Sequence, residues 1–191
     1  MKIVVGITGA SGLPLSSRLI DVLRQNSNIH VHVVASEGAL LVAREEPCTY
    51  PDLKPCDLVK YIKSMGVGID VSLSSMYASS SNVPDKVVIV PASMKSVASI
   101  SLGLANTLPT RVALNALRMG RELVLVPRET PLGSIELGHL YKLSTLGVKI
   151  VPPIPAFYPN PSSILDIIDF IVGKILDVMK IDHNLYKRYK H

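Results

Sequence analysis

Four segments of this chain place polar or glycine residues directly after a predicted strand. They are residues 9–12 (Gly-Ala-Ser-Gly), 36–37 (Ser-Glu), 91–95 (Pro-Ala-Ser-Met-Lys) and 127–129 (Pro-Arg-Glu). In open sheets of parallel strands, ligands bind beyond the carboxyl ends of the strands. The four segments therefore predict one binding site at that edge of a sheet.

The first of these segments belongs to a glycine-rich run, residues 6–12, between a predicted strand and a predicted helix. Glycine lets the backbone approach a ligand closely, and the N-terminus of the following helix favours a phosphate. The hydroxyl of Ser11 adds a further polar group. We expect this loop to bind a phosphate or a cofactor. The alternative is a tight turn that binds nothing.

Arg128 and Glu129 follow another buried strand and lie between Pro127 and Pro131. The two prolines restrict the backbone, which suits a rigid catalytic loop. Arginine can make two parallel hydrogen bonds to a phosphate or to a polar ring edge, and glutamate can transfer protons. The simpler interpretation is a surface ion pair.

Two further charged pairs are ambiguous from the residues alone. Arg111 and Arg118 are seven residues apart on one predicted helix, so they share a face, as a solvated stripe also would. Glu45 and Glu46 end another predicted helix. Adjacent carboxylates on a helix point in different directions, so at most one of these two is expected to face a site.

Histidines and cysteines give little support for a metal site. His30 and His32 face the same side of one predicted strand, but no carboxylate or third histidine is near them in sequence. His139 lies on a predicted helix, where a satisfied or exposed side chain is expected. Cys48 and Cys56 lie in a proline-rich loop, and we expect free thiols there. No metal is predicted.

The run Thr-Gly-Ala-Ser-Gly at residues 8–12 also resembles the opening of the NAD(P)-dependent short-chain dehydrogenases. That family needs Tyr-x-x-x-Lys on a helix well downstream. Residues 50–54 have this spacing but contain proline and come too early, and residues 186–190 follow the last core helix. Neither match supports a nicotinamide enzyme.

The elements that must position these residues alternate between short β-rich runs and longer helical ones. This pattern is typical of α/β proteins with a parallel sheet. Strands are expected at residues 2–8, 30–35, 86–90, 123–126 and 149–151. Helices are expected at residues 13–25, 36–44, 57–65, 94–104, 110–119, 135–146 and 164–179, with Gly147 ending the sixth. Residues 47–57 and the serine-rich residues 72–82 are expected to form loops, and long loops in compact domains are often functional.

Composition and charge are those of one α/β domain over residues 1–180, followed by a basic tail over residues 181–191. The chain has 191 residues, of which 48% are hydrophobic and 18% charged, so a disordered chain is excluded. A mean hydropathy of +0.35 indicates a large core or subunit interfaces. Residues 180–191 contain four basic residues and one acidic residue and so carry +3 of the net charge of +5, which leaves only +2 for the rest of the chain, and nucleic-acid binding is not expected.

A membrane segment and a signal peptide are not expected. The most apolar predicted helix, residues 164–179, contains four charged residues, whereas a spanning helix needs about 20 mostly apolar ones. The apolar run at the N-terminus is too short for a signal peptide. These features predict a cytoplasmic protein.

Five segments in order resemble the UbiX-type flavin prenyltransferases, a family formerly described as aromatic acid decarboxylases. They are residues 6–12 (Gly-Ile-Thr-Gly-Ala-Ser-Gly), 91–95 (Pro-Ala-Ser-Met-Lys), 111–118 (Arg-Val-Ala-Leu-Asn-Ala-Leu-Arg), 123–132 (Leu-Val-Leu-Val-Pro-Arg-Glu-Thr-Pro-Leu) and 152–158 (Pro-Pro-Ile-Pro-Ala-Phe-Tyr). The resemblance extends from about residue 2 to residue 180. The fourth and fifth segments are its specific part, whereas the glycine loop alone is a weak signal.

The resemblance implies a flavodoxin-like or Rossmann-like three-layer sandwich with a mostly parallel sheet. It implies a dodecamer built of trimers, FMN as the cofactor and dimethylallyl phosphate as the prenyl donor. Members join the prenyl group to N5 and C6 of reduced FMN, and the product serves a UbiD-type decarboxylase. No metal is needed in the family.

The resemblance also assigns roles to individual positions of this chain. The residues expected to bind FMN are Gly9, Ala10, Ser11, Ser36, Ser93, Met94, Lys95, Ser96 and Arg128. The residues expected to take part in catalysis are Ser11, Glu46 and Glu129. The residues expected to bind the phosphate of the donor are Arg111, Arg118, Tyr158 and Lys174. Cationic groups and a phenol hydroxyl would stabilise the phosphate as it leaves.

The sequence departs from the family pattern in several places. Arg118 stands where members commonly have lysine, and Lys174 where they often have arginine, and these two cations differ in geometry. Some members have tryptophan in the prenyl pocket, but this chain has none, and Tyr77 is a candidate replacement. Residues 79–81 fall where the family has a mobile loop along that pocket. Two alternatives stay open: a non-catalytic FMN carrier and a cysteinyl-peptide decarboxylase of the same fold.

Overall fold

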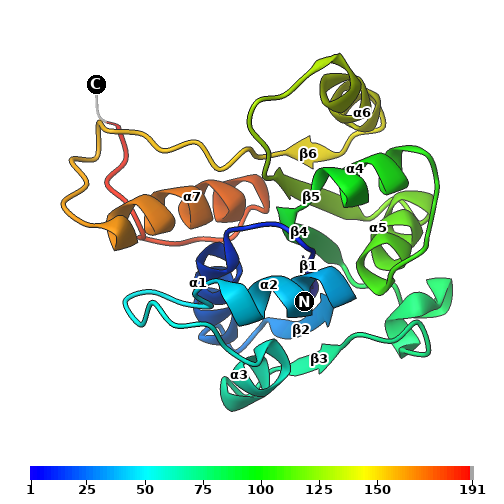
Figure 1. Ribbon diagram of the computed structural model, residues 1–191, viewed down its shortest axis with the longest axis horizontal. Coiled ribbons are helices and arrows are strands. Elements are labelled where there is room, and N and C mark those ends of the chain that lie inside the picture. The colour runs from blue at the N-terminus through cyan, green and yellow to red at the C-terminus, as the bar shows by residue number, and fades with distance from the viewer. Residues whose placement is uncertain (190–191) are drawn as a thin grey trace.

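Six strands form the centre of the molecule in the order β3-β2-β1-β4-β5-β6, and every pairing between them is parallel (Figure 1). The computed structural model describes residues 1–189. The strands are β1 (Lys2–Ile7), β2 (His30–Ala35), β3 (Gly68–Asp70), β4 (Lys86–Ala92), β5 (Glu122–Pro127) and β6 (Lys149–Ile150). The central strands are covered on both faces, so they are nearly continuous runs of Val, Ile and Leu.

Helices cover both faces of this sheet. They are α1 (Leu13–Arg24), α2 (Glu37–Glu45), α3 (Leu58–Ser64), α4 (Met94–Ser101), α5 (Leu108–Arg118), α6 (Ser134–Thr145) and α7 (Ile164–Val178). One buried cluster joins α1, α2, α3 and α7 to the sheet, and a second joins α4, α5 and α6 to its other face. The predicted three-layer α/β fold with a parallel sheet is therefore confirmed.

Most predicted elements agree with the structure to within a few residues, and the differences have local causes. The short edge strand β3 was not predicted, because its three residues, Gly-Ile-Asp, show no alternation. Helix α5 begins two residues earlier than predicted, because Thr107 caps it and Pro109 occupies its first turn. The serine-rich segment contains two short 3₁₀ turns, Met76–Ala78 and Ser80–Asn82. Gly147 follows α6 with a positive φ of 85°, as expected for a residue that ends a helix.

The prediction of free thiols at Cys48 and Cys56 is wrong, because the two form a disulfide. The loop between them folds back on itself, with an antiparallel bridge between Pro47 and Pro55. This pairing brings the two Cα atoms to 5.9 Å, within the ordinary range for a disulfide. No pattern in residues 47–57 indicates that fold-back.

The chain after α7 does not extend away from the domain. It runs back along α7, where Ile181 is buried and the ring of Tyr186 packs against Gly173 (Figure 1). Residues 190 and 191, the end of the predicted basic tail, lie outside the described residues. Within residues 1–189, no helix is long and apolar enough to cross a membrane.

Candidate active site

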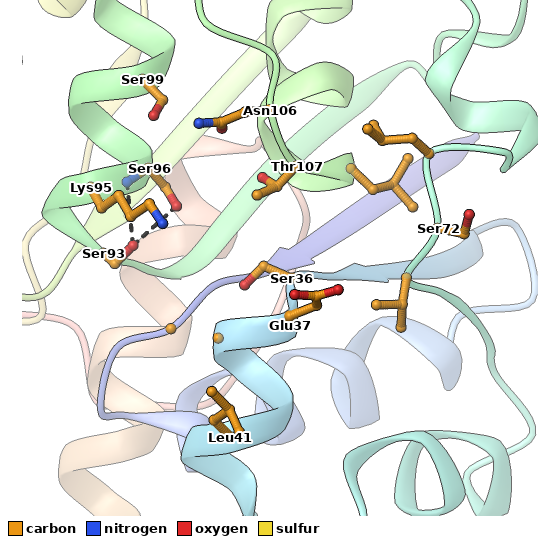
Figure 2. Close-up of a pocket in the computed structure, with 15 residues that line it drawn as sticks. Ser36, Glu37, Leu41, Ser72, Ser93, Lys95, Ser96, Ser99, Asn106 and Thr107 are labelled. Atoms are coloured by element: carbon orange, nitrogen blue, oxygen red, sulfur yellow. Dashed lines mark hydrogen bonds between the residues drawn. The ribbon is translucent and has the colours of Figure 1, made fainter.

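A cleft of about 850 Å³ opens at the carboxyl edge of the sheet, where β1 lies between β2 and β4. This is the point at which the strand order reverses, and it is the usual ligand site of such sheets. Figure 2 shows α2 and α4 facing each other across the cleft. The lining residues are Gly9, Ser36, Glu37, Gly38, Leu41, Val71, Ser72, Leu73, Ser93, Lys95, Ser96, Ser99, Asn106, Thr107 and Leu108.

Two glycines bring the loop after β1 into contact with the start of α2. A Cβ added to Gly9 would lie 3.0 Å from the Cα of Gly38, and one added to Gly38 would lie 3.2 Å from the Cα of Gly9. Both neighbours are backbone atoms, which cannot turn aside as a side chain can. The glycine loop is therefore needed for close packing at the cleft floor, and Gly9 itself is exposed to the cleft.

Thr8, which was not among the predicted site residues, connects this loop to the segment after β4. Its fully buried hydroxyl donates to the carbonyl of Pro91 at 2.8 Å and accepts from the backbone N–H of Ser93 at 2.8 Å. The two loops thus hold each other at a fixed separation. A buried threonine at the end of a strand is common, which is why its type alone did not identify it.

Three helices begin at the cleft, and each is capped by a hydroxyl. Ser36 accepts from the N–H of Ala39 at the start of α2. Ser93 caps α4 and also bonds the hydroxyl of Ser96 at 3.0 Å. Thr107 caps α5. Helix N-termini present free N–H groups and a partial positive charge, so their convergence favours an anion such as a phosphate.

Asn106 and Thr107 were missed by the sequence analysis, although Figure 2 shows them facing the cleft opposite Ser36. The only local signal was a threonine before Leu-Pro, which predicts a helix start and not a ligand. The two formal charges on the cleft walls are those of Lys95 on α4 and Glu37 on α2. The cleft is consequently rich in hydroxyls but close to neutral.

Arg128 and Glu129 lie at the same edge of the sheet, at the end of β5, but outside the cleft lining. The backbone N–H of Arg128 donates to the carbonyl of Ala92, the residue before the Ser93 cap. Its side-chain Nε is buried and has no hydrogen-bond partner within residues 1–189. The Glu129 carboxylate is exposed and accepts from the N–H of Thr130 at 3.1 Å. The arginine is thus an unsatisfied donor beside the cleft, and the glutamate an accessible carboxylate.

Ala10 and Met94 are next in sequence to cleft-lining residues and Ser11 is two residues from Gly9, but none of the three lines the cleft itself. Glu46 ends α2 in extended backbone and is half-buried. A rise of about 1.5 Å per residue places it about 12 Å along α2 from Gly38 at the cleft. Glu46 does not line the cleft within one chain.

The predicted donor-phosphate residues fall in two other places. Arg118 lies at the far end of α5, about 15 Å along the helix from Leu108, and donates to the side chain of Asn115 at 3.0 Å. Arg111 lies two turns before it on the same helix. Tyr158 and Lys174 lie instead with α7 and the chain that follows it.

The histidines that could have suggested a metal have other partners. His32 Nε2 lies 3.1 Å from Asp70 Oδ2, and its ring centroid is 4.5 Å from that of Tyr77. Burial lowers the pKa of His32 more than Asp70 raises it, so the ring is neutral at pH 7. His139 Nδ1 lies 2.6 Å from the Ser101 hydroxyl. Within residues 1–189, no group of three or more His, Cys, Asp or Glu side chains is arranged to hold a metal ion.

The structure therefore brings five predicted site residues into one cleft and leaves the others outside it. The five are Gly9, Ser36, Ser93, Lys95 and Ser96. Val71, Ser72 and Leu73 line the cleft, whereas residues 79–81 do not, and Tyr77 packs on His32.

Comparisons with known proteins match almost the full length of the chain. A family model described as Flavoprotein matches residues 1–187. The flavin prenyltransferase UbiX of Methanocaldococcus jannaschii is 38% identical over 189 residues, which cover 99% of this chain and 98% of that one. The dodecameric FMN-dependent UbiX-like decarboxylase from Escherichia coli O157:H7 has a TM-score of 0.90 at 35% identity, with 100% of both chains covered. AnUbiX (PadA1), solved in complex with FMN and dimethylallyl pyrophosphate, has a TM-score of 0.88 at 33% identity, covering 100% of this chain and 97% of that one.

These matches confirm the resemblance seen in the sequence. They favour a prenyltransferase over an FMN carrier and over a cysteinyl-peptide decarboxylase, because curated full-length relatives at 38–42% identity are named flavin prenyltransferases. The glycine loop, the capped helix starts and the Pro-Arg-Glu segment all lie within the matched residues. The chain belongs to the flavoprotein family and, within it, to the UbiX-type flavin prenyltransferases.

Proposed function

We propose that this protein transfers a dimethylallyl group from a prenyl phosphate to reduced FMN. The observation that supports this most directly is the cleft itself. Three capped helix N-termini and a glycine floor converge at the strand-order reversal, beside an arginine with a buried, unpaired donor. Family membership then favours a flavin over other phosphate-bearing ligands.

The residues present fit FMN. N–H groups at the starts of α2, α4 and α5 suit its phosphate and ribityl oxygens, and Gly9 leaves room for close approach. The unpaired Nε of Arg128 suits a carbonyl oxygen or nitrogen at the edge of the flavin ring. Lys95 adds a cation for the phosphate. We assign Gly9, Ala10, Ser11, Ser36, Ser93, Met94, Lys95, Ser96 and Arg128 to this cofactor.

Reduced FMN supplies the nucleophilic ring positions N5 and C6 to which the prenyl group is joined. The chain holds the acceptor still and manages protons around it. The Ser11 hydroxyl would supply a hydrogen bond to the bound flavin. The exposed carboxylate of Glu129 and the half-buried carboxylate of Glu46 serve as proton acceptors.

The donor must release a phosphate when its allylic C–O bond breaks. Cationic side chains and a phenol hydroxyl stabilise the developing dianion, and we assign this role to Arg111, Arg118, Tyr158 and Lys174. Within one chain these residues are divided between α5 and the α7 region. We therefore propose that neighbouring copies complete the site, as in a dodecamer in which subunits share their active sites.

Subunit sharing can be tested by mixing two inactive variants. Glu129→Ala and Arg118→Ala are each expected to lose most activity as homo-oligomers. Dissociation and co-assembly should restore activity if the two residues meet in one site from different copies, because some mixed sites contain both native residues. If verified mixed oligomers recover no activity, the two residues do not meet in one site from different copies. Either both belong to the same copy's site, or Arg118 is not part of the site. Light scattering of the native protein tests the dodecamer separately.

The product, prenylated FMN, is a cofactor for a second enzyme, and we assign its use to a UbiD-type decarboxylase in the cytoplasm. Co-expression tests this step. Activation of an apo UbiD-type decarboxylase in cells that lack their own prenyltransferase is the expected result. Fractionation of the source cells tests the compartment.

The defining experiment is anaerobic incubation of the pure protein with reduced FMN and dimethylallyl phosphate, followed by mass spectrometry of the extracted flavin. The expected result is a flavin heavier by one C₅H₈ unit. If the monophosphate gives unmodified FMN, the diphosphate is tested next, and failure with both donors contradicts the proposal.

A further inference from the structure

The chain after α7 packs against that helix at Gly173, where the missing side chain leaves a notch. A Cβ at this position would lie 2.5 Å and 2.6 Å from two ring atoms of Tyr186 and 2.8 Å from a ring atom of His183. The two rings therefore occupy the space that any side chain at position 173 would need. We call residues 183–189 the clamp. They can pack closely on α7 because Gly173 has no side chain.

Asp177 on α7 binds three side chains of the clamp. Its carboxylate accepts hydrogen bonds from the Tyr186 hydroxyl at 2.5 Å, from His183 Nε2 at 3.0 Å and from Arg188 at 2.7 Å. The side chain of His183 is only 2% exposed. Burial acts to raise the pKa of Asp177, but the bonds from Arg188, Tyr186 and His183 outweigh it and hold that pKa well below its usual value.

Lys174 lies between the clamp and solvent. Its Nζ is 3.4 Å from the Tyr186 hydroxyl and 3.5 Å from Asp177 Oδ2, and it lies 5.8 Å from the centroid of the Tyr186 ring. The side chain is still 46% exposed, so it can contact a ligand without leaving these partners. A lysine stem has many rotamers, and these contacts restrict them.

The same clamp contacts Tyr158. The Tyr158 ring meets Tyr189 edge-on at 5.4 Å and Phe170 at 5.9 Å, while Phe170 meets Tyr186 at 5.0 Å. Phe170 and Lys174 are one turn apart on α7 and so share a face. Tyr158 and Lys174 are thus held on one aromatic frame, although 16 residues separate them in sequence.

We propose that the clamp positions the phosphate-binding pair of the prenyl donor, with Tyr186 and Asp177 orienting the Lys174 ammonium and the aromatic frame orienting Tyr158. This inference rests on the proposed function, which assigns Lys174 and Tyr158 to the donor. Tyr186 and Asp177 act through Lys174 and are positioning residues. Their removal should weaken the use of donor and leave FMN binding intact.

The first test is Tyr186→Phe, which keeps the ring in the notch and removes only the hydroxyl. The KM for dimethylallyl phosphate is expected to rise about tenfold, the effect of losing one hydrogen bond to a charged group. The kcat and the dissociation constant of FMN should stay within about twofold of wild type, because no cleft residue is changed. Tyr141→Phe, at an exposed tyrosine on α6, is the matched control and should change nothing.

The second test is Gly173→Ala, which alters no polar group. Alanine favours a helix interior over glycine by about 1 kcal/mol, so α7 itself is not weakened. The added methyl group should displace the clamp, raise the same KM and speed tryptic cleavage after Lys187 and Arg188, which needs no activity to measure. Gly138→Ala on α6, where a Cβ meets nothing within 4 Å, is the control.

The outcomes separate this inference from the proposed function. If wild-type protein prenylates FMN but both variants keep its KM, the clamp is only structural and the inference is wrong. A fall in kcat at constant KM also overturns it. If wild-type protein fails with both donors, the proposed function fails, and the clamp proposal fails with it. Raised KM in both variants, with unchanged FMN affinity, supports the inference.

Discussion

The cleft differs in composition from the clamp region, by which we mean the clamp together with Tyr158 and the α7 residues that contact it. The cleft consists of glycines, helix caps and backbone N–H groups, with only one lysine and one glutamate on its walls. The clamp region instead gathers Asp177, Lys174 and Arg188 around aromatic rings. Contacts in the clamp region join residues far apart in the chain, such as Tyr158 and Tyr189. Most residues of the cleft walls instead lie just after a strand or at the start of a helix.

The difference shows how the fold divides its tasks. Backbone groups at helix starts are rigid, so they suit a cofactor that must be held in one position through a reaction. The clamp region holds Lys174 through its contacts with Tyr186 and Asp177 but leaves it 46% exposed, so this side chain suits a substrate phosphate that enters intact and leaves as a product.

Glu129 belongs to neither region, so it provides the sharpest separation of binding from chemistry. Glu129→Ala should retain FMN with unchanged affinity and lower the rate of prenylation by at least about 100-fold, the usual effect of losing a proton-transferring group. Fluorescence titration of FMN and mass spectrometry of the flavin product measure the two quantities. Glu45→Ala, an exposed carboxylate at the end of α2, serves as control. Wild-type turnover in Glu129→Ala would remove that residue from the mechanism.

Gly9→Ala should damage the cleft and spare the clamp. The new Cβ would lie 3.0 Å from a backbone atom of Gly38, so the floor must shift. We expect FMN affinity to fall about 30-fold, equivalent to about 2 kcal/mol. The rate of tryptic cleavage in the clamp should not change. Gly138→Ala is the control, and equal FMN binding by the two variants would show that the close packing of the floor is dispensable.

Asp177→Asn should affect the clamp and spare the cleft, with a defined pH dependence. Because the native pKa of Asp177 is depressed, its ionised form stabilises the fold above the ordinary pKa of about 3.9, and this contribution is lost as pH falls towards the native pKa. The variant should be less stable than wild type by about 1.5 kcal/mol at pH 7. Thermal unfolding should show the difference shrinking below about pH 4. A difference independent of pH would exclude the carboxylate charge as its cause.

The smallest effect compares two helix caps, a serine at the cleft and an aspartate away from it. Ser36 caps α2 at the cleft, and Asp57 caps α3 away from it, with Asp57 Oδ1 accepting from the N–H of Lys60. Ser36→Ala should cost about 1 kcal/mol of stability, and Asp57→Ala should also lower stability. Only Ser36→Ala should also weaken FMN binding, by about fivefold. Equal FMN affinities in the two variants would mean that the α2 start does not contact the cofactor.

The cleft was more predictable from sequence than the clamp for a physical reason. Gly9, Ser36 and Ser93 follow strands directly, and parallel topology brings such positions to one edge. Thr107 belongs to the same cleft but follows a helix, so its place depended on how α5 packs. The family resemblance named Tyr158 and Lys174 without showing what lies beside them.

The features that sequence analysis missed depend on chain segments that fold back. The clamp requires residues 183–189 to return along α7, and its only local sign is a glycine inside a helix, which usually signals nothing more than lower helix propensity. The Cys48–Cys56 disulfide requires a similar return within a proline-rich loop. Neither reversal has a periodic pattern that could reveal it.

The strand order has a practical consequence for fragment complementation. One wall of the cleft comes from residues before Ser74 and the other from residues after Pro91, and the exposed serine-rich segment lies between them. A cut in that segment would give two fragments, each with three neighbouring strands of the sheet and one wall of the cleft. FMN would contact both fragments, so their reassembly would depend on the FMN concentration. The fragment pair could then serve as a sensor of free FMN.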